Sequence, residues 1–262
     1  MIPATAIIEW ENDHPWANKK QVEQDLIISR ALVAIYNNQF LASRLAFRGG
    51  TAMYKLYLSP LRYSEDIDLV QIQPENIGNI FDKLREVLSF LGKPAVKQKK
   101  NNNTMVFRVN STFPPVMPIN LKIEINCKEH FTVLGLKKMP FEVENQWFSG
   151  RCEITTYQLD ELTGTKFRAL YQRKKGRDLF DLQKALENPN LNTDNVVGCF
   201  RKYISFSDGN PPSKTVYLAN LDEKMQDRFF LSDIQPLLRP SMIYNPHEAY
   251  EVVKMGLIEK LE

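Results

Sequence analysis

Asp66 and Asp68 occupy alternate positions in a short, otherwise largely apolar run. In an extended strand, side chains alternate between two faces, so both carboxylates point to one face, about 6.5–7 Å apart along the chain. Ile67 and Leu69 then point the other way, into a core. Two carboxylates on one face repel each other unless a cation lies between them, and hard oxygen ligands suit Mg²⁺. The spacing predicts metal-dependent phosphate chemistry; the alternative for an isolated Asp-x-Asp pair is a solvated surface.

Glu124 is the natural third carboxylate. It lies on the polar side of residues 119–126, in which apolar and polar residues alternate as in a half-buried strand. If this strand neighbours the strand of Asp66 and Asp68, the three acids converge on one point. Carboxylates that hold two metal ions about 3.5–4 Å apart can orient the phosphates of a nucleotide and activate an attacking oxygen.

A glycine turn precedes the two aspartates. Gly49 and Gly50 allow close approach of the backbone to a triphosphate, and the helix that Thr51 begins offers its N-terminal N–H groups to anions. Ser64, two residues before Asp66, shares its face and could hydrogen-bond a phosphate. The simpler alternatives are an ordinary strand-to-helix turn and a serine that caps its own turn.

A charged block follows at residues 162–182. Lys166 and Arg173 are seven residues apart, two turns along one helix face, where both could reach the phosphates of a nucleotide. Asp178 and Asp181 lie on neighbouring positions of the next helix, where they could position these cations or help to hold metal. A solvent-facing helix with local ion pairs is the alternative.

These residues need a scaffold of strands and helices. Apolar spacing predicts helices over 21–44, 51–58 and 74–91, and strands over 45–48, around Asp66–Asp68, and over 104–110 and 119–126. Further short strands are expected at 131–136 and 153–155. Residues 97–103 are expected to be a hairpin tip or a mobile excursion, and the chain after residue 157 is expected to be helical with three breaks. The expected architecture is an α/β (α+β) domain over 1–156 with a mixed sheet, followed by a mainly helical domain over 157–262.

Bulk properties narrow the classes of protein. With 262 residues, 43% hydrophobic and 25% charged, the chain has the composition of a soluble globular protein with a sizeable core. Its net charge of +3 does not demand a nucleic-acid partner. Three scattered cysteines without metal-ligand spacing favour reduced thiols and a cytoplasmic location. We expect no secretory signal and no membrane span, since no run approaches about 20 apolar residues.

Lysines 93, 97, 99 and 100 form a basic stretch beside three asparagines. They could guide a polyanionic acceptor such as RNA, or simply keep the loop solvated. The three histidines have no spacing that suggests zinc or catalysis.

Taken together, these motifs resemble the AbiEii/AbiGii family of nucleotidyltransferase-like toxins, relatives of DNA polymerase β. The resemblance covers roughly residues 45–185 and is carried by Phe47-Arg48-Gly49-Gly50-Thr51, Ser64-Glu65-Asp66-Ile67-Asp68-Leu69, Lys122-Ile123-Glu124-Ile125, and the block from Lys166 through Arg173 to Arg177-Asp178-Leu179-Phe180-Asp181. Related sequences often have serine where this chain has Gly50. The resemblance implies a polymerase-β-type mixed sheet with flanking helices and a helical C-terminal part.

It also implies a nucleoside triphosphate substrate with Mg²⁺ (Mn²⁺ as an alternative), a cognate antitoxin encoded nearby, and an RNA acceptor such as tRNA. We expect Asp66, Asp68 and Glu124 to hold the metal, with Lys166 and Asp178 completing the catalytic set. The expected nucleotide-binding residues are Gly49, Gly50, Thr51, Ser64, Lys166, Arg173 and Asp181. A phosphotransferase on the same scaffold, a non-catalytic partner-binding protein with a relic site, and a nuclease that uses the same acids are the alternatives.

Overall fold

The computed structural model describes residues 2–99 and 101–262, so the expectation for Lys100 lies outside the described residues. The chain folds into two compact units. The first holds the described residues up to Thr132 together with Leu136–Tyr157 and Leu237–Pro240, and the second holds Val133–Gly135, Gln158–Pro236 and Ser241–Glu262. The chain therefore passes between the units several times, and a short segment from late in the sequence belongs to the first unit.

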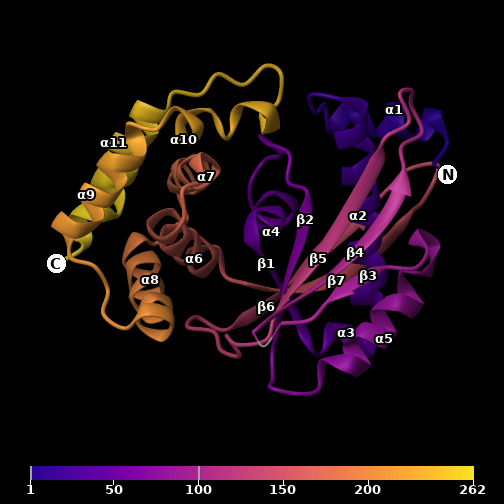
Figure 1. Cartoon of the computed structure of the whole chain (residues 1–262), viewed down its shortest axis with the longest axis horizontal. Helices are drawn as coiled ribbons and strands as arrows, with labels where there is room; N and C mark the ends of the chain where they lie inside the picture. Colours follow the sequence, from indigo (N-terminus) through magenta and orange to yellow (C-terminus); the bar gives the residue numbers. More distant parts are fainter. Residues whose placement is uncertain (1, 100) are drawn as a thin grey trace. The chain divides into compact units, whose positions relative to one another are not determined.

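The first unit is built on a seven-stranded mixed sheet with strand order β3-β4-β5-β2-β1-β7-β6 (Figure 1). Its strands are β1 (Leu45–Arg48), β2 (Asp66–Gln71), β3 (Ala95–Lys97), β4 (Asn102–Asn110), β5 (Pro118–Asn126), β6 (Leu136–Val143) and β7 (Gly150–Tyr157). Its helices are α1 (Ala4–Asp13), α2 (Lys19–Asn37), α3 (Gln39–Ala42), α4 (Gly49–Leu56), α5 (Ile77–Val87) and the 3₁₀ turn η1 (Ser89–Leu91). Strand β2 pairs in parallel with β5 and antiparallel with β1, so it is a central strand.

Strict alternation along β2 and β5 separates an apolar face of the sheet from a polar one. Ile67, Leu69, Ile123 and Ile125 are at most 1% exposed and form the core side. Helix α2 packs on β5, β6 and β7, and α4 packs on β1 and β2. Because successive side chains of a strand point to opposite faces, the polar residues of β2 and β5 share the other face.

Two expected elements differ in the structure. The helix predicted over 21–44 begins at Lys19 and stops at Asn37, because the Asn38 side chain caps α3 by accepting from the N–H of Leu41. The strand predicted over 131–136 is wrong before its last residue, since β6 begins at Leu136. The N–H groups of Val133 and Leu134 instead donate to the Glu161 carboxylate, so they are not available to a strand ladder.

The second unit is helical. It contains α6 (Leu159–Gln172), α7 (Gly176–Leu186), α8 (Thr193–Asp208), α9 (Lys214–Met225), α10 (Arg228–Ser232), α11 (Pro246–Gly256) and the 3₁₀ turns η2 (Gln235–Leu237), whose last residue belongs to the first unit, and η3 (Ile258–Lys260). Its core joins all the longer helices through buried aromatic and aliphatic side chains, among them Phe167, Phe200, Tyr217 and Val253. The expected fold class, a mixed sheet with flanking helices followed by a helical part, is confirmed.

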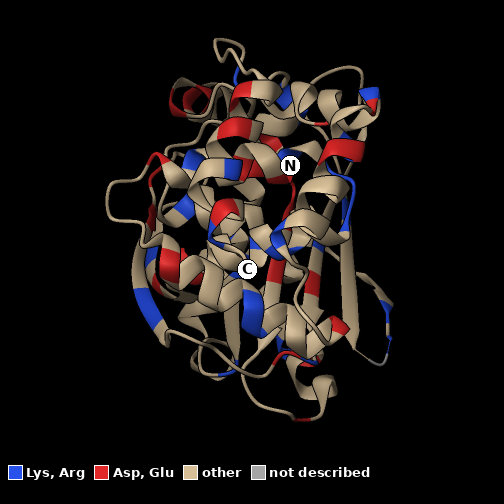
Figure 2. Ribbon diagram, turned by 90° about the vertical axis from the view of Figure 1, so that its left-hand side faces the viewer, with Lys and Arg blue, Asp and Glu red and all other residues tan. Residues whose placement is uncertain are grey.

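Charges of both signs are interspersed along the ribbon (Figure 2). Among the described residues, no helix combines the length and apolar character that crossing a bilayer requires. Strands β3 and β4 pair antiparallel, which agrees with the hairpin expected around residues 97–103.

Candidate active site

The structure brings the three predicted carboxylates to one face of the sheet. In the parallel pairing of β2 with β5, Asp68 lies opposite Glu124 and Asp66 lies opposite Lys122. Asp66 and Asp68 share a face by alternation within β2, and Glu124 shares it because directly opposed residues of paired strands point the same way. The expectation that these two strands are neighbours is confirmed.

Lys122 lies among these acids. Its Nζ is 2.9 Å from Oε1 of Glu124 and 3.4 Å from Oδ2 of Asp66. All three side chains are about one-third exposed, so solvent still reaches them. The single positive charge of the ammonium offsets part of the repulsion between these two carboxylates. Lys122 was not among the predicted site residues, although its position two residues before Glu124 places it on the same face.

Asp66 has a strongly perturbed acidity. The pKa of its carboxyl is raised from 3.8 to about 6, chiefly by burial; Lys122 acts against this shift, and the nearby charges of Asp68 and Glu65 add to it. A carboxylate that resists ionisation until a cation arrives is typical of a site whose charge is balanced by a bound ion. The pKa of Lys122 is raised: burial acts to lower it, and the ion pairs with Glu124 and Asp66 outweigh burial.

The chemistry of this donor set fits Mg²⁺, since it consists of carboxylate oxygens only. In the described part of the chain, no group of three His, Cys, Asp or Glu side chains has the arrangement of a ready metal site. The Lys122 ammonium takes the place of a cation between Asp66 and Glu124. Metal binding at these residues therefore requires that Lys122 withdraw from at least one carboxylate.

The glycine turn lies against the carboxylate of Asp68. Gly49 has φ +81°, a conformation that favours glycine, and a Cβ there would lie 2.1 Å from Oδ2 of Asp68. Helix α4 starts at this turn without a side-chain cap and without an acid in its first turn. The turn thus orients the positive end of the helix and its first N–H groups, an arrangement that favours an anion, while the adjacent Asp68 carboxylate would repel a phosphate unless a cation lies between them.

Thr51 and Ser64 join this turn to the beginning of β2. Thr51 is 2% exposed, and its Oγ1 lies 2.5 Å from the carbonyl oxygen of Asp66 and 2.8 Å from Oγ of Ser64. A carbonyl can only accept, so the Thr51 hydroxyl donates to Asp66 and accepts the proton of Ser64. Both hydroxyls therefore hold the backbone on either side of the metal-ligand candidates.

Two arginines near the site were not singled out from the sequence. Arg48 lies opposite Asp68 in the pairing of β1 with β2, and its Nη1 is 2.5 Å from Oε2 of Glu129. Burial acts to lower the pKa of Arg48, but the Glu129 carboxylate raises it overall. Arg62 is 2% exposed and contacts the first turn of α4. The position of Arg48 immediately before Gly49 could have identified it as a site residue from the sequence. No local sequence pattern identifies Arg62.

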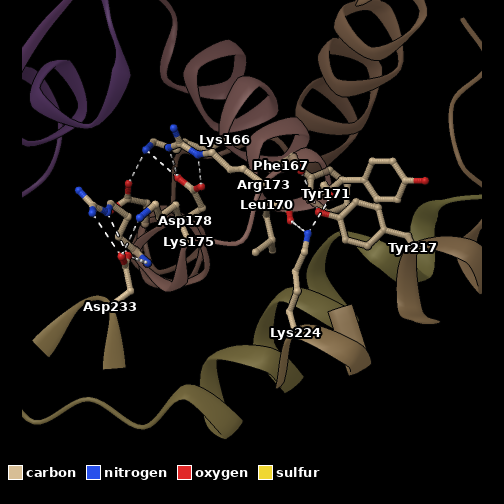
Figure 3. A network of polar contacts seen from close by, with 12 residues as sticks. Lys166, Phe167, Leu170, Tyr171, Arg173, Lys175, Asp178, Tyr217, Lys224 and Asp233 are labelled. Atoms are coloured by element: carbon tan, nitrogen blue, oxygen red, sulfur yellow. Dashed lines mark hydrogen bonds and ion pairs between the residues drawn. The ribbon is translucent and has the colours of Figure 1, made fainter. Parts of the chain in front are cut away.

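The predicted residues of the second unit form a separate, internally paired cluster (Figure 3). Lys166 Nζ is 3.0 Å from Oδ1 of Asp178 and 2.8 Å from Oδ2 of Asp181. Arg173 makes a bidentate ion pair with the same Asp178, with its Nε 2.6 Å from Oδ2 and its Nη2 2.7 Å from Oδ1. The side chain of Arg173 is 52% exposed, whereas that of Lys166 is 8% exposed.

Both aspartates of this cluster are fully buried, so the alternative of a solvent-facing helix with local ion pairs is wrong here. Burial acts to raise the pKa of Asp178, but Lys166 and Arg173 together hold it below its ordinary value. Breaking such a buried network on one side leaves an uncompensated charge, which is costly. Asp178 therefore pairs with both Lys166 and Arg173, and Asp181 pairs with Lys166.

Lys224 completes the C-terminal end of α6. It donates to the carbonyl of Leu170 and, at 2.7 Å, to that of Tyr171 (Figure 3). Burial lowers its pKa to about 8. These carbonyls belong to the last turn of α6, where helices leave acceptors without intrahelical partners. The side chain thus stabilises the helix that presents Lys166.

An open cavity of about 1070 Å³ lies elsewhere in the first unit, over β6, β7 and the end of α2. None of the predicted site residues lines it. Its lining mixes charged residues such as Lys138, Glu142, Arg151 and Glu153 with Tyr36 and Phe141. Size alone does not mark this cavity as the site, because no phosphate-binding turn or acid cluster accompanies it.

Comparison with known proteins agrees with this geometry. Residues 30–253 match the family model described as nucleotidyl transferase AbiEii toxin, type IV TA system. The fold is similar to that of MenT4, a nucleotidyltransferase toxin of Mycobacterium tuberculosis H37Rv, with a TM-score of 0.63 and 15% identity over 99% of this chain and 89% of that one. It is also similar to a putative nucleotidyltransferase from H. pylori, with a TM-score of 0.54 and 17% identity over 93% and 96% of the two chains. None of the curated proteins matches this chain.

Proposed function

Because the chain belongs to the AbiEii family of nucleotidyl transferase toxins of type IV toxin–antitoxin systems, we propose that it transfers a nucleotide from a nucleoside triphosphate to an acceptor, with Mg²⁺ as cofactor and RNA such as tRNA as acceptor. Membership of a toxin–antitoxin family implies an antitoxin partner.

One observation carries the proposal. The register of β2 with β5 places Asp68 opposite Glu124, while Asp68 also lies against the glycine turn at Gly49. Asp68 therefore belongs to the set of carboxylates and also lies next to a turn suited to phosphates. Metal ligands adjoining a phosphate-binding turn are what nucleotidyl transfer needs, because catalysis of this reaction is mainly positioning and charge neutralisation.

In the proposed reaction, the acceptor hydroxyl attacks the α-phosphorus of the nucleotide. A new O–P bond forms as the bond from the α-phosphorus to the bridging oxygen breaks, and pyrophosphate leaves with that electron pair. Mg²⁺ held by Asp66, Asp68 and Glu124 would neutralise charge on the phosphates. Glu124 completes this ligand set or accepts the hydroxyl proton. The backbone N–H groups of Gly49 and Gly50 hold the outer phosphates.

The remaining predicted residues divide into supporting and charge-bearing groups. Thr51 and Ser64 keep the turn and β2 in register through their hydroxyl contacts. Lys166 and Arg173 are proposed to neutralise phosphate charge during transfer, with Asp178 and Asp181 holding them. Arg173 is the more accessible of the two cations, because 52% of its side chain is exposed against 8% for Lys166.

The test uses purified protein, Mg²⁺ and total bacterial RNA with each nucleoside triphosphate, labelled in parallel at the α- and the γ-phosphate. We expect α-label on RNA, lost in Asp66→Asn and retained in Asp82→Asn. Asp82 is a matched control, because its side chain is 76% exposed and forms only a surface i,i+3 pair with Arg85 among the contacts described.

Transfer of the γ-label alone would replace the proposal by a phosphotransferase on the same scaffold. No incorporation of either label, and no Mg²⁺-dependent nucleotide binding by correctly folded protein, would instead favour a partner-binding protein with a relic site. RNA shortened in the presence of Mg²⁺ alone would point to a nuclease.

A further inference from the structure

The polar face of the sheet continues beyond the three acids onto β4 and β3. Glu124 of β5 lies opposite Thr104 of β4, and Thr104 lies opposite Lys97 of β3. Because directly opposed residues of paired strands point the same way, Lys97 shares the face of Glu124 and Asp68. Neighbouring strands are about 4.8 Å apart, so the backbone of Lys97 lies about 10 Å from that of Glu124. One row of side chains therefore runs from the acids to the edge strand β3.

Arg108 is a second cation on this part of the face. It lies on β4, four residues after Thr104, and opposite Asn120 of β5. Lys97, Arg108 and Asn120 are exposed. Met105 and Phe107, which alternate with Thr104 and Arg108 along β4, are fully buried on the other face. The polar face of β3, β4 and β5 is therefore open to solvent and carries amide and cationic groups.

The two exposed cations differ from Lys122 in their partners. The Lys122 ammonium is paired with Asp66 and Glu124. Neither Lys97 nor Arg108 forms an ion pair with any residue that the structure describes. Their positive charges are thus available to an anion from outside the chain. They lie beside the acids on the same face, so a polyanion held by them would reach the candidate active site.

The position of the glycine turn decides from which side an acceptor arrives. A Cβ on Gly49 would lie 2.1 Å from Oδ2 of Asp68, and Gly49 directly follows β1, so the turn adjoins the acids on the β1 side. From β2, the sheet continues in the opposite direction through β5 and β4 to β3. The attacking and leaving oxygens of such a transfer lie roughly in line with the phosphorus. With the leaving pyrophosphate at the turn, the acceptor hydroxyl therefore comes from the side of β5, β4 and β3.

We propose that the polar face of β3, β4 and β5 binds the 3′ end of a single-stranded RNA acceptor, with Lys97 and Arg108 contacting the phosphates that precede its terminal hydroxyl. The inference rests on the proposed function and assigns the acceptor subsite of the same active site. A free strand end fits this face because a second strand would bring further phosphates over the acids. Exposed amides such as that of Asn120 suit hydrogen bonds to unpaired base edges and 2′-hydroxyls.

Loss of either cation should weaken RNA binding and leave nucleotide binding unchanged. Each exposed phosphate contact accounts for about a 5-fold change in KM and Kd for RNA, which we expect for Lys97→Gln and for Arg108→Gln. The two side chains lie on rows about 13 Å apart along the strands, so the losses should multiply to about 25-fold in the double variant. The slope of log K against log salt should fall in magnitude by about 1.4, because single strands contribute about 0.7 for each phosphate contact.

The experiment measures binding of a labelled single-stranded RNA of about 12 nucleotides with a free 3′ hydroxyl, by fluorescence anisotropy over a range of salt. Steady-state transfer of the α-label to total bacterial RNA gives KM for the acceptor, and calorimetry gives Kd for the nucleoside triphosphate. Lys97→Arg and Arg108→Lys should keep most of the RNA affinity, since a phosphate contact at these exposed positions needs chiefly the charge. Arg85→Gln is the matched control, because it removes an exposed charge from α5, which packs with α2 and α3.

Circular dichroism establishes that the variants fold, as expected for substitutions of exposed side chains. An unchanged RNA Kd and salt slope in the double variant would overturn the acceptor subsite, and so would an equal loss in Arg85→Gln. Equal affinity of the wild type for a blunt RNA duplex, or α-label on protein instead of RNA, would also overturn it. Failure of the wild type to bind any nucleoside triphosphate or to transfer α-label would overturn the proposed function. Loss of oligonucleotide binding in the double variant would in that case still support the RNA-binding face, so the two failures are distinguishable.

Discussion

The sharpest prediction concerns the stability of the metal-free protein. Asp66 lies about one-third exposed on the polar face of the sheet, with its pKa raised from 3.8 to about 6 by burial and by neighbouring carboxylates. Its ionised form is therefore unfavourable in the folded state. Replacing it with asparagine, which is close in shape and uncharged, should stabilise the metal-free protein at neutral pH while abolishing transfer.

The magnitude follows from the pKa shift of Asp66. A shift of about two units corresponds to about 3 kcal/mol at 1.36 kcal/mol per unit, and partial exposure reduces this through solvent screening to about 1–2 kcal/mol. A gain of that size raises the melting temperature of a chain of this length by about 2–4 °C. Because the folded state binds the proton more tightly than the unfolded state, the wild type loses this free energy as the pH rises from about 4 to about 6.

The assay is thermal and urea unfolding of wild type, Asp66→Asn and the surface control Asp82→Asn, in chelator, at pH 4.5 and 7.5. The gain in the free energy of unfolding of Asp66→Asn over wild type should reach its full size at pH 7.5 and should be much smaller at pH 4.5. The control Asp82→Asn should show no gain at either pH. Addition of about 10 mM Mg²⁺ should stabilise the wild type by about 1.4 kcal/mol for a dissociation constant near 1 mM, and the variant by less. A variant that is less stable than wild type at pH 7.5 in chelator would refute the reasoning.

Three further predictions come from other contacts. Lys122→Met removes the ammonium that bridges two carboxylates. It should lower the free energy of unfolding of the metal-free protein by about 1 kcal/mol and should increase the stabilisation by Mg²⁺, as measured by thermal melting with and without the metal. Asp178→Asn removes a fully buried carboxylate that pairs with both Lys166 and Arg173, so urea unfolding should show a loss of about 3 kcal/mol or more in the free energy of unfolding. An unchanged midpoint would contradict the role of the buried network. Gly176→Ala places a Cβ 2.0 Å from the carbonyl oxygen of Phe230, and we expect a loss of about 1–3 kcal/mol, whereas Gly198→Ala, where a Cβ meets open space, should be tolerated.

Local patterns predicted much of the fold. The alternation over 119–126 matches β5, and the apolar spacing over 74–91 matches α5 followed by the 3₁₀ turn η1. Both patterns depend only on how neighbouring side chains project from the backbone. The break at Asn38 and the true extent of β6 were missed, because a capping side chain and a partner strand decided them.

The candidate site shows the same division between local and non-local information. Asp66, Asp68 and Glu124 were found from spacing and residue type, and the structure places all three on one face. Lys122 between the acids and Arg62 beside Gly50 were missed. Each depends on which strand or segment lies alongside, and nothing within a few residues of either specifies that neighbour.

The sequence by itself determined the chemical kinds of group and their local spacing: two carboxylates on one strand face, a third on another strand, and a glycine turn before them. Only the tertiary structure decided that Glu124 opposes Asp68, that a lysine lies between the acids, and that Asp178 and Asp181 are fully buried. The physical reason is that side-chain periodicity is a property of the local backbone. Register, burial and the resulting pKa shifts arise from contacts between segments far apart in the chain.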